Sequence, residues 1–519
     1  MDALADSLKV IADWITQHIT MWALIATGLF LTVVTRGVQV RHLPTMIRQV
    51  ASSRSGAAGG ISSFQAFAIS LAARVGVGNV FGVAAALLYG GPGAVFWMWV
   101  VALVGMATAF FEATLAQIFK VRAPDGSFRG GPAFYMARGM GGAGGRVMAG
   151  VFAVITLVTC GFIITSVQSN AVAGTLVAAL GGGEGSALPG FGGLSAAQLV
   201  VAGLVLVLTA VVVFGGIRAV ARVTEWMAPI MALIYIVLVA VVCLLNLGDF
   251  WRVIGRIISS AFAPEPLVGG LGGGVLAAVI NGTKRGLFSN EAGQGTAPNA
   301  AATATVAHPV QQGLIQSLGV FVDTIVVCTA TAFVILIAGP AVWGAEGANP
   351  STLTTLAIAH GLGGWTVLPM AVLIFVLAYS SIIAAYVYTD VNMDYLTGGR
   401  RWASWTVRVV SVASATAGAV LSLDVVWNAV DIAMAVMTLT NLVALVRLYR
   451  WGTGALHDYE AQVRAGVAEP VFRGRDNPRL PGDVPGEVWS DDDGRAGAPS
   501  APPAAPADPP SSASTTAKD

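Results

Sequence analysis

Charged residues are scarce in this sequence. Asp, Glu, Lys and Arg make up only 11% of its 519 residues, and its mean hydropathy is +0.75. An ordinary soluble domain has about 25% charged residues, so the composition excludes a chain of water-soluble domains. The few Lys and Arg residues form no basic face, which excludes nucleic acid as a partner.

Soluble-enzyme motifs are also missing. No phosphate-binding run of the GxxxxGK[ST] type is present, so ATP hydrolysis is not expected. The five histidines have no metal-ligand spacing, and the three cysteines each lie among Val, Leu and Ile, where a thiol is most simply a small apolar residue. No set of nucleophile, base and metal ligands converges, so we expect no catalytic residues and no enzyme.

Long apolar runs are what the sequence has instead. Runs of about 20 residues, the length that crosses a bilayer as a helix, follow one another with short polar breaks. Strands of a membrane barrel would alternate in polarity, and these runs do not. The sequence therefore predicts an all-α polytopic membrane protein in a lipid bilayer. About eleven spans are expected, near 19–35, 64–89, 94–119, 147–180, 196–214, 226–247, 270–284, 313–338, 366–391, 402–421 and 425–446.

Positive charge alternates between the loops. The basic loops hold Arg36, Arg41, Arg48 and Arg54; Lys120, Arg122, Arg129 and Arg138; Arg218 and Arg222; Lys284 and Arg285; and Arg400 and Arg401. The positive-inside rule makes these loops cytoplasmic, with the N-terminus outside and the C-terminus inside the cell membrane. Residues 451–519 are polar and end in a stretch rich in Pro, Ala, Ser and Asp, so we expect a disordered cytoplasmic tail.

Helix-breaking residues occur at membrane depth in two places. The first is RVGVGNVFG at 74–82, and the second is NGTKRGLFSNEAGQGTAP at 281–298. Glycine is costly inside a helix, and unpaired backbone is tolerated in hydrocarbon only where it lines a cavity. Close helix packing explains single glycines, but it does not explain the Asn and charged residues beside them. We therefore interpret both places as functional breaks.

The two breaks open spans that lie five apart and run in opposite directions. This spacing predicts an inverted repeat, 61–265 followed by 266–450, behind an N-terminal helix and loop at 1–60. In such folds the positive end of a half-helix faces an anionic group while unwound carbonyls hold a cation. An amino-acid zwitterion together with sodium meets both requirements, although electrostatics alone permits other zwitterions.

Several long motifs resemble the alanine/glycine:cation symporter family. They are VGVGN at 75–79, GGPGAVFWMW at 90–99, KRGLFSNEAG at 284–293 and HPVQQG at 308–313, followed by VDT at 322–324. The resemblance covers about 18–450 and implies the leucine-transporter-type five-plus-five inverted repeat behind one extra helix. It also implies symport of alanine or glycine. One departure is Val77, because the family usually has Thr or Ser between the two glycines; a hydroxyl ligand is lost there, whereas backbone ligation is not.

The candidate substrate-binding residues lie at the breaks and in the fourth span. At the first break they are Gly76, Val77, Gly78 and Asn79, whose freed amides can meet a carboxylate; at the second they are Asn281 and Gly282. Gln168 and Asn170 lie two residues apart and can face different neighbours. One of them reaches the substrate, or both make hydrogen bonds between helices.

The candidate sodium ligands are Ser380 and Ser381 together with Gly76. The resemblance implies this role, since the corresponding helix of the leucine-transporter fold supplies hydroxyls to a sodium beside the first break. From physics alone, a serine hydroxyl also bonds to its own helix backbone. Hard oxygen ligands suit a hard cation.

Arg74 and Glu291 are the candidate gating residues. They pair as an inner gate, or each separately braces unwound backbone. Asp323 and Asp431 are buried mid-span, and structural pairing is the expected role of each. Together these features predict a secondary transporter that couples a small amino acid to sodium. The alternatives are proton coupling and a channel, but no pore-lining ring or repeated filter sequence is present.

Overall fold

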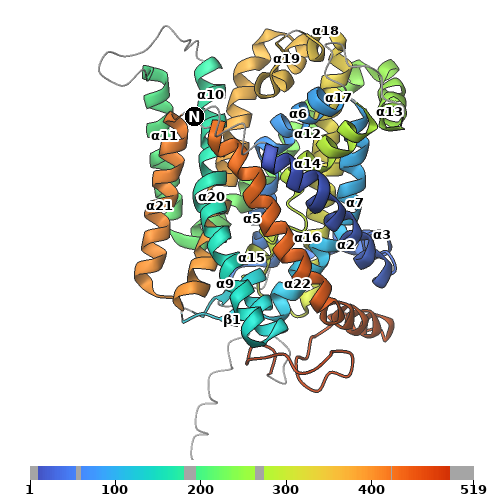
Figure 1. Ribbon diagram of the computed structural model, residues 1–519, viewed down its shortest axis with the longest axis vertical. Helices are drawn as coiled ribbons and strands as arrows, with labels where there is room; N and C mark the ends of the chain where they lie inside the picture. The colour runs from blue at the N-terminus through green and yellow to red at the C-terminus, as the bar shows by residue number, and fades with distance from the viewer. Residues whose placement is uncertain are drawn as a thin grey trace, which may run out of the picture.

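The computed structural model describes residues 10–53, 60–124, 126–179, 194–262, 274–345, 347–421 and 424–490. They form an upright bundle of helices with one short β-hairpin at its lower end (Figure 1). In the first half the elements are η1 Thr16–Thr20, α2 Met21–Val34, α3 Val38–Arg41, α4 Leu43–Ser52, α5 Ser63–Arg74, η2 Gly78–Gly82, α6 Val83–Gly90, α7 Gly93–Ile118, β1 Val121–Arg122, β2 Phe128–Arg129, α8 Pro132–Tyr135, η3 Met136–Met140, α9 Gly142–Val158, η4 Thr159–Ile164, α10 Thr165–Ala179, α11 Ala196–Val213, α12 Gly216–Leu245 and α13 Leu247–Phe262. In the second half they are α14 Val275–Asn290, α15 Ala297–Ala301, α16 Pro309–Val320, η5 Phe321–Cys328, α17 Thr329–Ala338, α18 Pro340–Trp343, α19 Pro350–Leu362, η6 Gly364–Thr366, α20 Val367–Thr397, α21 Arg401–Val420 and α22 Asp424–Arg464.

Many of these helices are long and apolar enough to cross a membrane. Within the described residues eight qualify outright, and a ninth span is the pair α5 and η2–α6, which bend by 46° at a short break. Two further expected spans coincide with α14 and α21. Helix α14 has only 16 residues, and α21 includes Arg401 and Arg408, which lower its hydropathy. The helical membrane fold predicted from the apolar runs is confirmed.

The first break lies where the sequence predicts it. Helix α5 begins at a capping box, in which the Ser62 hydroxyl accepts from the Gln65 amide and the Gln65 side chain accepts from the Ser62 amide. It ends at Arg74, because Val75 has non-helical dihedral angles (φ −78°, ψ 81°). The chain then resumes as the π-helical turn η2 and the short helix α6.

The second break is shorter than predicted. Helix α14 continues to Asn290, and only 291–296 are non-helical, with positive φ at Glu291 (55°), Gly293 (86°) and Gly295 (81°). Asn281 and Gly282 therefore lie inside an intact helix, and their assignment to a substrate-binding break is wrong. A Cβ at Gly282 would lie 2.4 Å from the Ala94 carbonyl oxygen of α7, so this glycine allows close packing of two helices.

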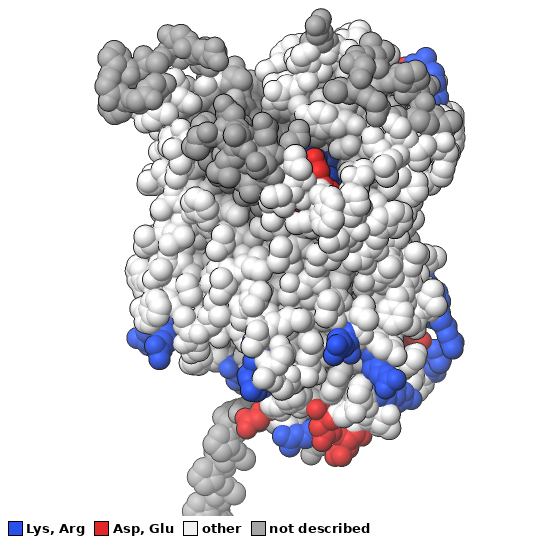
Figure 2. Space-filling model, in the orientation of Figure 1, with Lys and Arg blue, Asp and Glu red and all other residues white. Residues whose placement is uncertain are grey.

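Basic side chains gather at the lower end of the bundle, called the basic end here (Figure 2). Two residues predicted in a basic loop are exceptions, since Lys284 and Arg285 lie within α14. Lys284 Nζ lies 2.5 Å from Asp13 Oδ1 and 3.3 Å from Asp431 Oδ2. Asp431 thus has the structural pairing that we expected. The ion pairs explain how a lysine is accommodated in a spanning helix.

The segment after 450 is ordered as far as Ser490, and the prediction of a disordered tail is wrong for 451–490. Helix α22 runs to Arg464, and the following chain folds back under the bundle, where Phe472 and Trp489 are buried. Trp489 Nε1 donates to the Gln117 carbonyl oxygen at 3.0 Å. Because the segment is mostly polar, its composition does not reveal the few aromatic residues that pack against the bundle. The remaining predicted tail, 491–519, lies outside the described residues.

Lys120 lies beneath this segment, at the end of α7. Its Nζ donates to the Ala304 carbonyl oxygen at 2.9 Å and lies 4.0 Å from the Phe128 ring centre and 5.0 Å from that of Trp489. Burial, followed by the charge of Arg122, holds the pKa of Lys120 well below its ordinary value. The segment therefore covers a buried amine as well as apolar surface.

Truncation after Gly466 should consequently destabilise the protein. It removes Phe472 and Trp489, each of which contributes about 1.5–3 kcal/mol by burial, and leaves the surface beneath them exposed. We expect a clearly lower melting temperature in detergent by differential scanning fluorimetry. Truncation after Ser490 is the matched control and should melt like the full chain. Equal melting of both truncated proteins would contradict this prediction.

Candidate functional site

Two hydroxyls of α20 face the first break. Ser381 Oγ lies 3.0 Å from the carbonyl oxygens of both Ala72 and Ala73, and Ser380 Oγ lies 3.0 Å from that of Ala72. Both hydroxyls also reach the Leu377 carbonyl oxygen of their own helix. Four oxygens thus converge where α5 ends. Such a set of hard, neutral oxygens fits a sodium ion.

Gly76 lies against the Ser381 hydroxyl. A Cβ at this position would lie 2.3 Å from Ser381 Oγ and 3.3 Å from Gln168 Nε2. Residue 76 must therefore be glycine for α20 to approach the break this closely. The structure brings together Gly76, Ser380 and Ser381, which are the three residues predicted to hold sodium.

Gln168 and Asn170 have separate environments. Gln168 Oε1 accepts from the Val77 amide at 3.4 Å, so this side chain lies at the first break. Asn170 Nδ2 donates to the carbonyl oxygens of Gly418 and Leu421, next to the end of α21. Residues two apart on a helix point about 200° apart. Gln168 therefore remains a candidate for substrate binding, whereas the assignment of Asn170 is corrected to a bond between helices.

Gly78 begins the half-helix that follows the break and faces α14. A Cβ at this position would lie 3.1 Å from the Phe288 ring and 3.3 Å from Ser289 Cα. A side chain at this position would require the Phe288 ring or the adjoining backbone of α14 to shift by a few tenths of an ångström. The Phe288 ring therefore covers the start of η2 on the side that faces α14.

A buried carboxylate connects the two broken spans. Asp323 Oδ1 accepts from Asn79 Nδ2 at 2.6 Å, and Asp323 Oδ2 accepts from the hydroxyls of Ser289 and Thr324, each at 2.8 Å. Asn79 Oδ1 in turn accepts from the Gly76 amide at 3.0 Å. Asn79 thus braces the first break from within, and Asp323 joins that break to the end of α14.

Arg74 and Glu291 do not form an ion pair within the described residues. Arg74 Nη1 donates to the Gln316 carbonyl oxygen at 3.1 Å, while Glu291 Oε2 accepts from the Thr296 hydroxyl at 2.7 Å. Arg74 is only 2% exposed, and its Nε and Nη2 have no hydrogen-bond partner among the described residues. The paired inner gate therefore does not describe this conformation; Arg74 contacts helix α16, and Glu291 contacts a side chain of its own break, so their gating role stays a prediction.

Glu112 of α7 holds the second break in shape. Its carboxylate accepts from the amides of Gly295 at 2.8 Å and Gly293 at 3.1 Å, and also from Asn441 Nδ2. Asn441 also donates to the Gly293 carbonyl oxygen. The carboxylate thus occupies amides that the non-helical turn leaves unpaired. Its role is structural, and the freed amides of this break are already taken.

The first break is closed from solvent on the side opposite the basic end. There α19 packs against η2, and the Thr354 hydroxyl donates to the Val80 carbonyl oxygen at 3.3 Å. Val77 and Asn79 are fully buried. The break is therefore shielded from solvent on this side.

Sequence reasoning missed the parts of the site that come from other spans. Asp323 was expected to be structural, but it joins the first break to the end of α14, and no contact was predicted for Ser289 or Glu112. The signal available was an isolated carboxylate inside an apolar run. That signal marks the residue but does not identify its partners, which are 34 and 244 residues away.

The family comparison matches nearly the whole chain. The model of the Sodium:alanine symporter family matches residues 1–474. Amino-acid carrier protein AlsT of Bacillus subtilis is 40% identical over 494 residues, which are 95% of this chain and 99% of that protein. Sodium/alanine symporter AgcS of Methanococcus maripaludis is 35% identical over 433 residues, 82% of this chain and 90% of that one.

A solved structure shows the same architecture. The crystal structure of MhsT in complex with L-phenylalanine matches with a TM-score of 0.54 at 16% identity, covering 76% of this chain and 91% of that one. At this level of identity the likeness shows the fold alone. The predicted leucine-transporter-type fold is thereby confirmed.

Proposed function

Because the chain belongs to the sodium:alanine symporter family, we propose that it carries alanine or glycine across the cell membrane together with sodium, by alternating access. The chain is accordingly a transporter and not an enzyme. The proposed coupling ion is sodium, and the proposed organic substrate is a small neutral amino acid.

The observation that supports this proposal best is the convergence of four oxygens at a broken helix. The carbonyls of Ala72 and Ala73 and the hydroxyls of Ser380 and Ser381 suit a hard monovalent cation. The half-helix that begins at Gly78 points its positive end toward the same break. The proposed site thus offers oxygens to a cation beside the positive end of a half-helix. In this conformation the Val77 amide donates to Gln168 and the Gly76 amide to Asn79, so a substrate carboxylate would take the place of these acceptors.

The size of the substrate follows from what surrounds the amides. The Phe288 ring lies against Gly78, and Gln168 lies against Val77. These contacts crowd the break, so we expect it to accept only a small side chain. We expect alanine and glycine to compete well for uptake and leucine to compete poorly.

Proton coupling is the second candidate. Asp323 is a fully buried carboxylate beside the first break, and it has no cation within salt-bridge distance among the described residues. Protonation would remove one acceptor from the link between Asn79 and Ser289. A carboxylate in this position could exchange a proton as the site opens.

Uptake into proteoliposomes distinguishes the candidates. Radiolabelled alanine should accumulate under an inward sodium gradient and not under an equal potassium gradient. Accumulation driven by an inward proton gradient in sodium-free buffer would favour the second candidate. If alanine only equilibrates across the membrane and neither gradient drives its accumulation, both candidates are wrong, since that result describes a channel.

The proposed orientation places the basic end in the cytoplasm, with the N-terminus outside, as the positive-inside rule predicts. Val10 and Val467 are exposed positions near the two ends of the described chain. Cysteines at these positions should react with a membrane-impermeant maleimide from opposite sides of intact cells, Val10→Cys from outside and Val467→Cys only after lysis. Labelling of both from one side would contradict the orientation.

Ser381→Ala should raise the sodium concentration needed for uptake. The change removes a hydroxyl within 3.0 Å of two break carbonyls without adding bulk. Loss of one oxygen ligand should cost about 1–2 kcal/mol, roughly a 5- to 30-fold rise in the half-saturating sodium concentration. Ser411→Ala, a buried serine of α21, is the matched control. Unchanged sodium dependence in Ser381→Ala would remove this residue from the site.

A further inference from the structure

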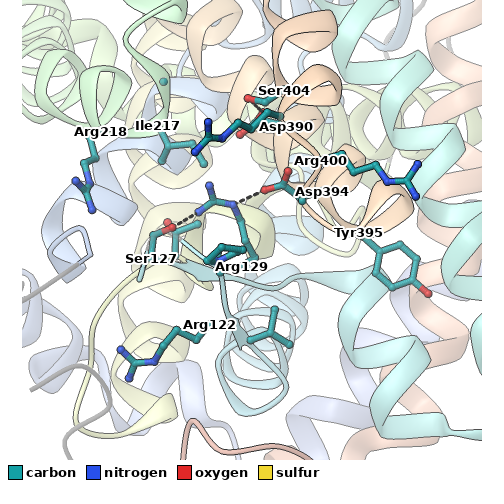
Figure 3. Close-up of a pocket in the computed structure, with 18 of the residues that line it drawn as sticks. Arg122, Ser127, Arg129, Ile217, Arg218, Asp390, Asp394, Tyr395, Arg400 and Ser404 are labelled. Carbon is teal, nitrogen blue, oxygen red and sulfur yellow. Dashed lines mark hydrogen bonds and ion pairs between the residues drawn. The ribbon is translucent and has the colours of Figure 1, made fainter. Parts of the chain in front are cut away.

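A large cavity lies at the basic end, separate from both breaks. Its volume is about 850 Å³. Figure 3 shows that its walls come from the β1–β2 hairpin, the turn between α11 and α12, the end of α20 and the start of α21. None of the residues from Gly76 to Asn79 lines it. The cavity is therefore a second concave site, within the range of about 300–1,000 Å³ typical of ligand pockets.

The cavity wall is strongly positive. Seven arginines line it, against two aspartates, Asp390 and Asp394. The arginines are Arg122, Arg129, Arg138, Arg218, Arg400, Arg401 and Arg408. Both carboxylates already have donors, since Arg129 Nε lies 2.7 Å from Asp394 Oδ2 and Ser404 Oγ lies 3.0 Å from Asp390 Oδ1 (Figure 3). Arginines therefore outnumber carboxylates by seven to two around the space.

Membrane topology alone does not explain this arrangement. The positive-inside rule requires Lys and Arg in one set of loops, but it does not require them to converge on one cavity. Here they come from three regions far apart in the sequence, 122–138, 218 and 400–408. Like charges held close together repel one another, so such a wall is stable when a counter-charge lies between them.

Two further features of the wall are suited to an anion. Tyr386 is only 1% exposed, and its hydroxyl lies next to the Arg408 guanidinium, whose Nη1 donates to the Phe214 carbonyl oxygen at 3.2 Å. The N-terminus of the 20-residue helix α21 also faces the cavity at Arg400 and Arg401, without a side-chain cap. An uncapped helix N-terminus favours an anion, yet these first residues carry positive charge instead of the usual acidic one.

We propose that this cavity binds a phosphate-bearing anion. Guanidinium groups match phosphate oxygens with two parallel hydrogen bonds, and the free amides of α21 and the Tyr386 hydroxyl add neutral donors. The anion comes either from solution, as a nucleotide or diphosphate, or from a phospholipid headgroup. Recognition by the wall is the same in both cases. The site is independent of the proposed transport function, because it uses none of the residues at the breaks.

Direct binding measurements test the proposal. The double variant Arg122→Gln/Arg401→Gln removes two exposed arginines from the wall, and the matched control, Arg447→Gln/Arg450→Gln, removes two exposed arginines of α22 outside it. Pyrophosphate binding to detergent-purified, delipidated protein is measured by isothermal titration calorimetry. Binding of a headgroup-labelled phosphatidylglycerol to protein in phosphatidylcholine nanodiscs is measured in parallel.

Wild type and control should bind at least one of the two probes with similar affinity, and the cavity variant should bind it roughly tenfold more weakly. Pyrophosphate binding identifies a soluble anion, and selective phosphatidylglycerol binding identifies a headgroup. Raised salt should weaken either interaction. The proposal is overturned if neither probe binds, or if control and cavity variant lose affinity equally, since that describes a diffuse positive surface.

Discussion

The Gly78→Leu protein should reach the membrane in normal amounts and bind no alanine. Residue 78 begins the half-helix η2, and a Cβ there already lies 3.1 Å from the Phe288 ring. The rest of a leucine side chain would push against α14 and into the space next to the Val77 and Gly78 amides. Because those amides are the proposed carboxylate donors, affinity should fall by at least 100-fold, about 3 kcal/mol or more.

The control for this substitution is Gly174→Leu. Gly174 lies in α10, and a Cβ there has no neighbour within 4 Å. This variant tests whether an added leucine in a spanning helix disturbs insertion in itself. Binding is measured by scintillation proximity with radiolabelled alanine on purified protein. Wild-type affinity in Gly78→Leu would show that the break is only a hinge and that the carboxylate is held elsewhere.

Asp323→Ala should abolish transport and destabilise the protein. The carboxylate accepts from Asn79, Ser289 and Thr324, all within 2.8 Å. Its removal leaves buried donors unpaired, at about 1–3 kcal/mol for each that finds no new acceptor. It also releases Asn79, which holds the Gly76 amide. Both the shape of the first break and its attachment to α14 would be lost.

Asp323→Asn separates hydrogen bonding from charge. The amide oxygen can still accept from Asn79, and the amide nitrogen can donate to the hydroxyls of Ser289 and Thr324, which can rotate to accept. We expect sodium-driven uptake to persist at a reduced rate in Asp323→Asn and to be absent in Asp323→Ala. If Asp323→Asn loses all uptake while keeping wild-type melting, the negative charge itself takes part in coupling. Wild-type uptake in Asp323→Ala would show that the link between the breaks is dispensable.

The sequence predicted those parts of the fold that depend on local chemistry. The length of the apolar runs predicted the spans, and the first break was predicted at its observed position because glycines, Asn and Arg occur together there. Ser380, Ser381 and Gly76 were predicted to share a site by resemblance to a family. Their convergence requires α20 to cross α5, which no local pattern shows.

What sequence reasoning could not distinguish was why a glycine is present. Gly282 and Gly76 look alike in the sequence, but one lies where two intact helices touch and the other lies at an unwound turn. Asn281 makes ordinary hydrogen bonds to the carbonyls of Ala277 and Tyr89. The prediction of a disordered tail was wrong for a related reason. Composition does not show that two aromatic residues of this polar stretch, Phe472 and Trp489, are buried against the bundle. In each case the deciding contact comes from a distant segment.

The ion pairs of Lys284 have a consequence for the extra N-terminal helix. That helix extends over Val10–Val34, and its Asp13 is the nearer of the two carboxylates that neutralise a lysine in α14. A minimal protein cut back to the ten-helix repeat would therefore lose the nearer counter-ion of Lys284 and keep only Asp431, in addition to losing a peripheral helix. Fusion partners or thermostabilising deletions at this end should spare residue 13.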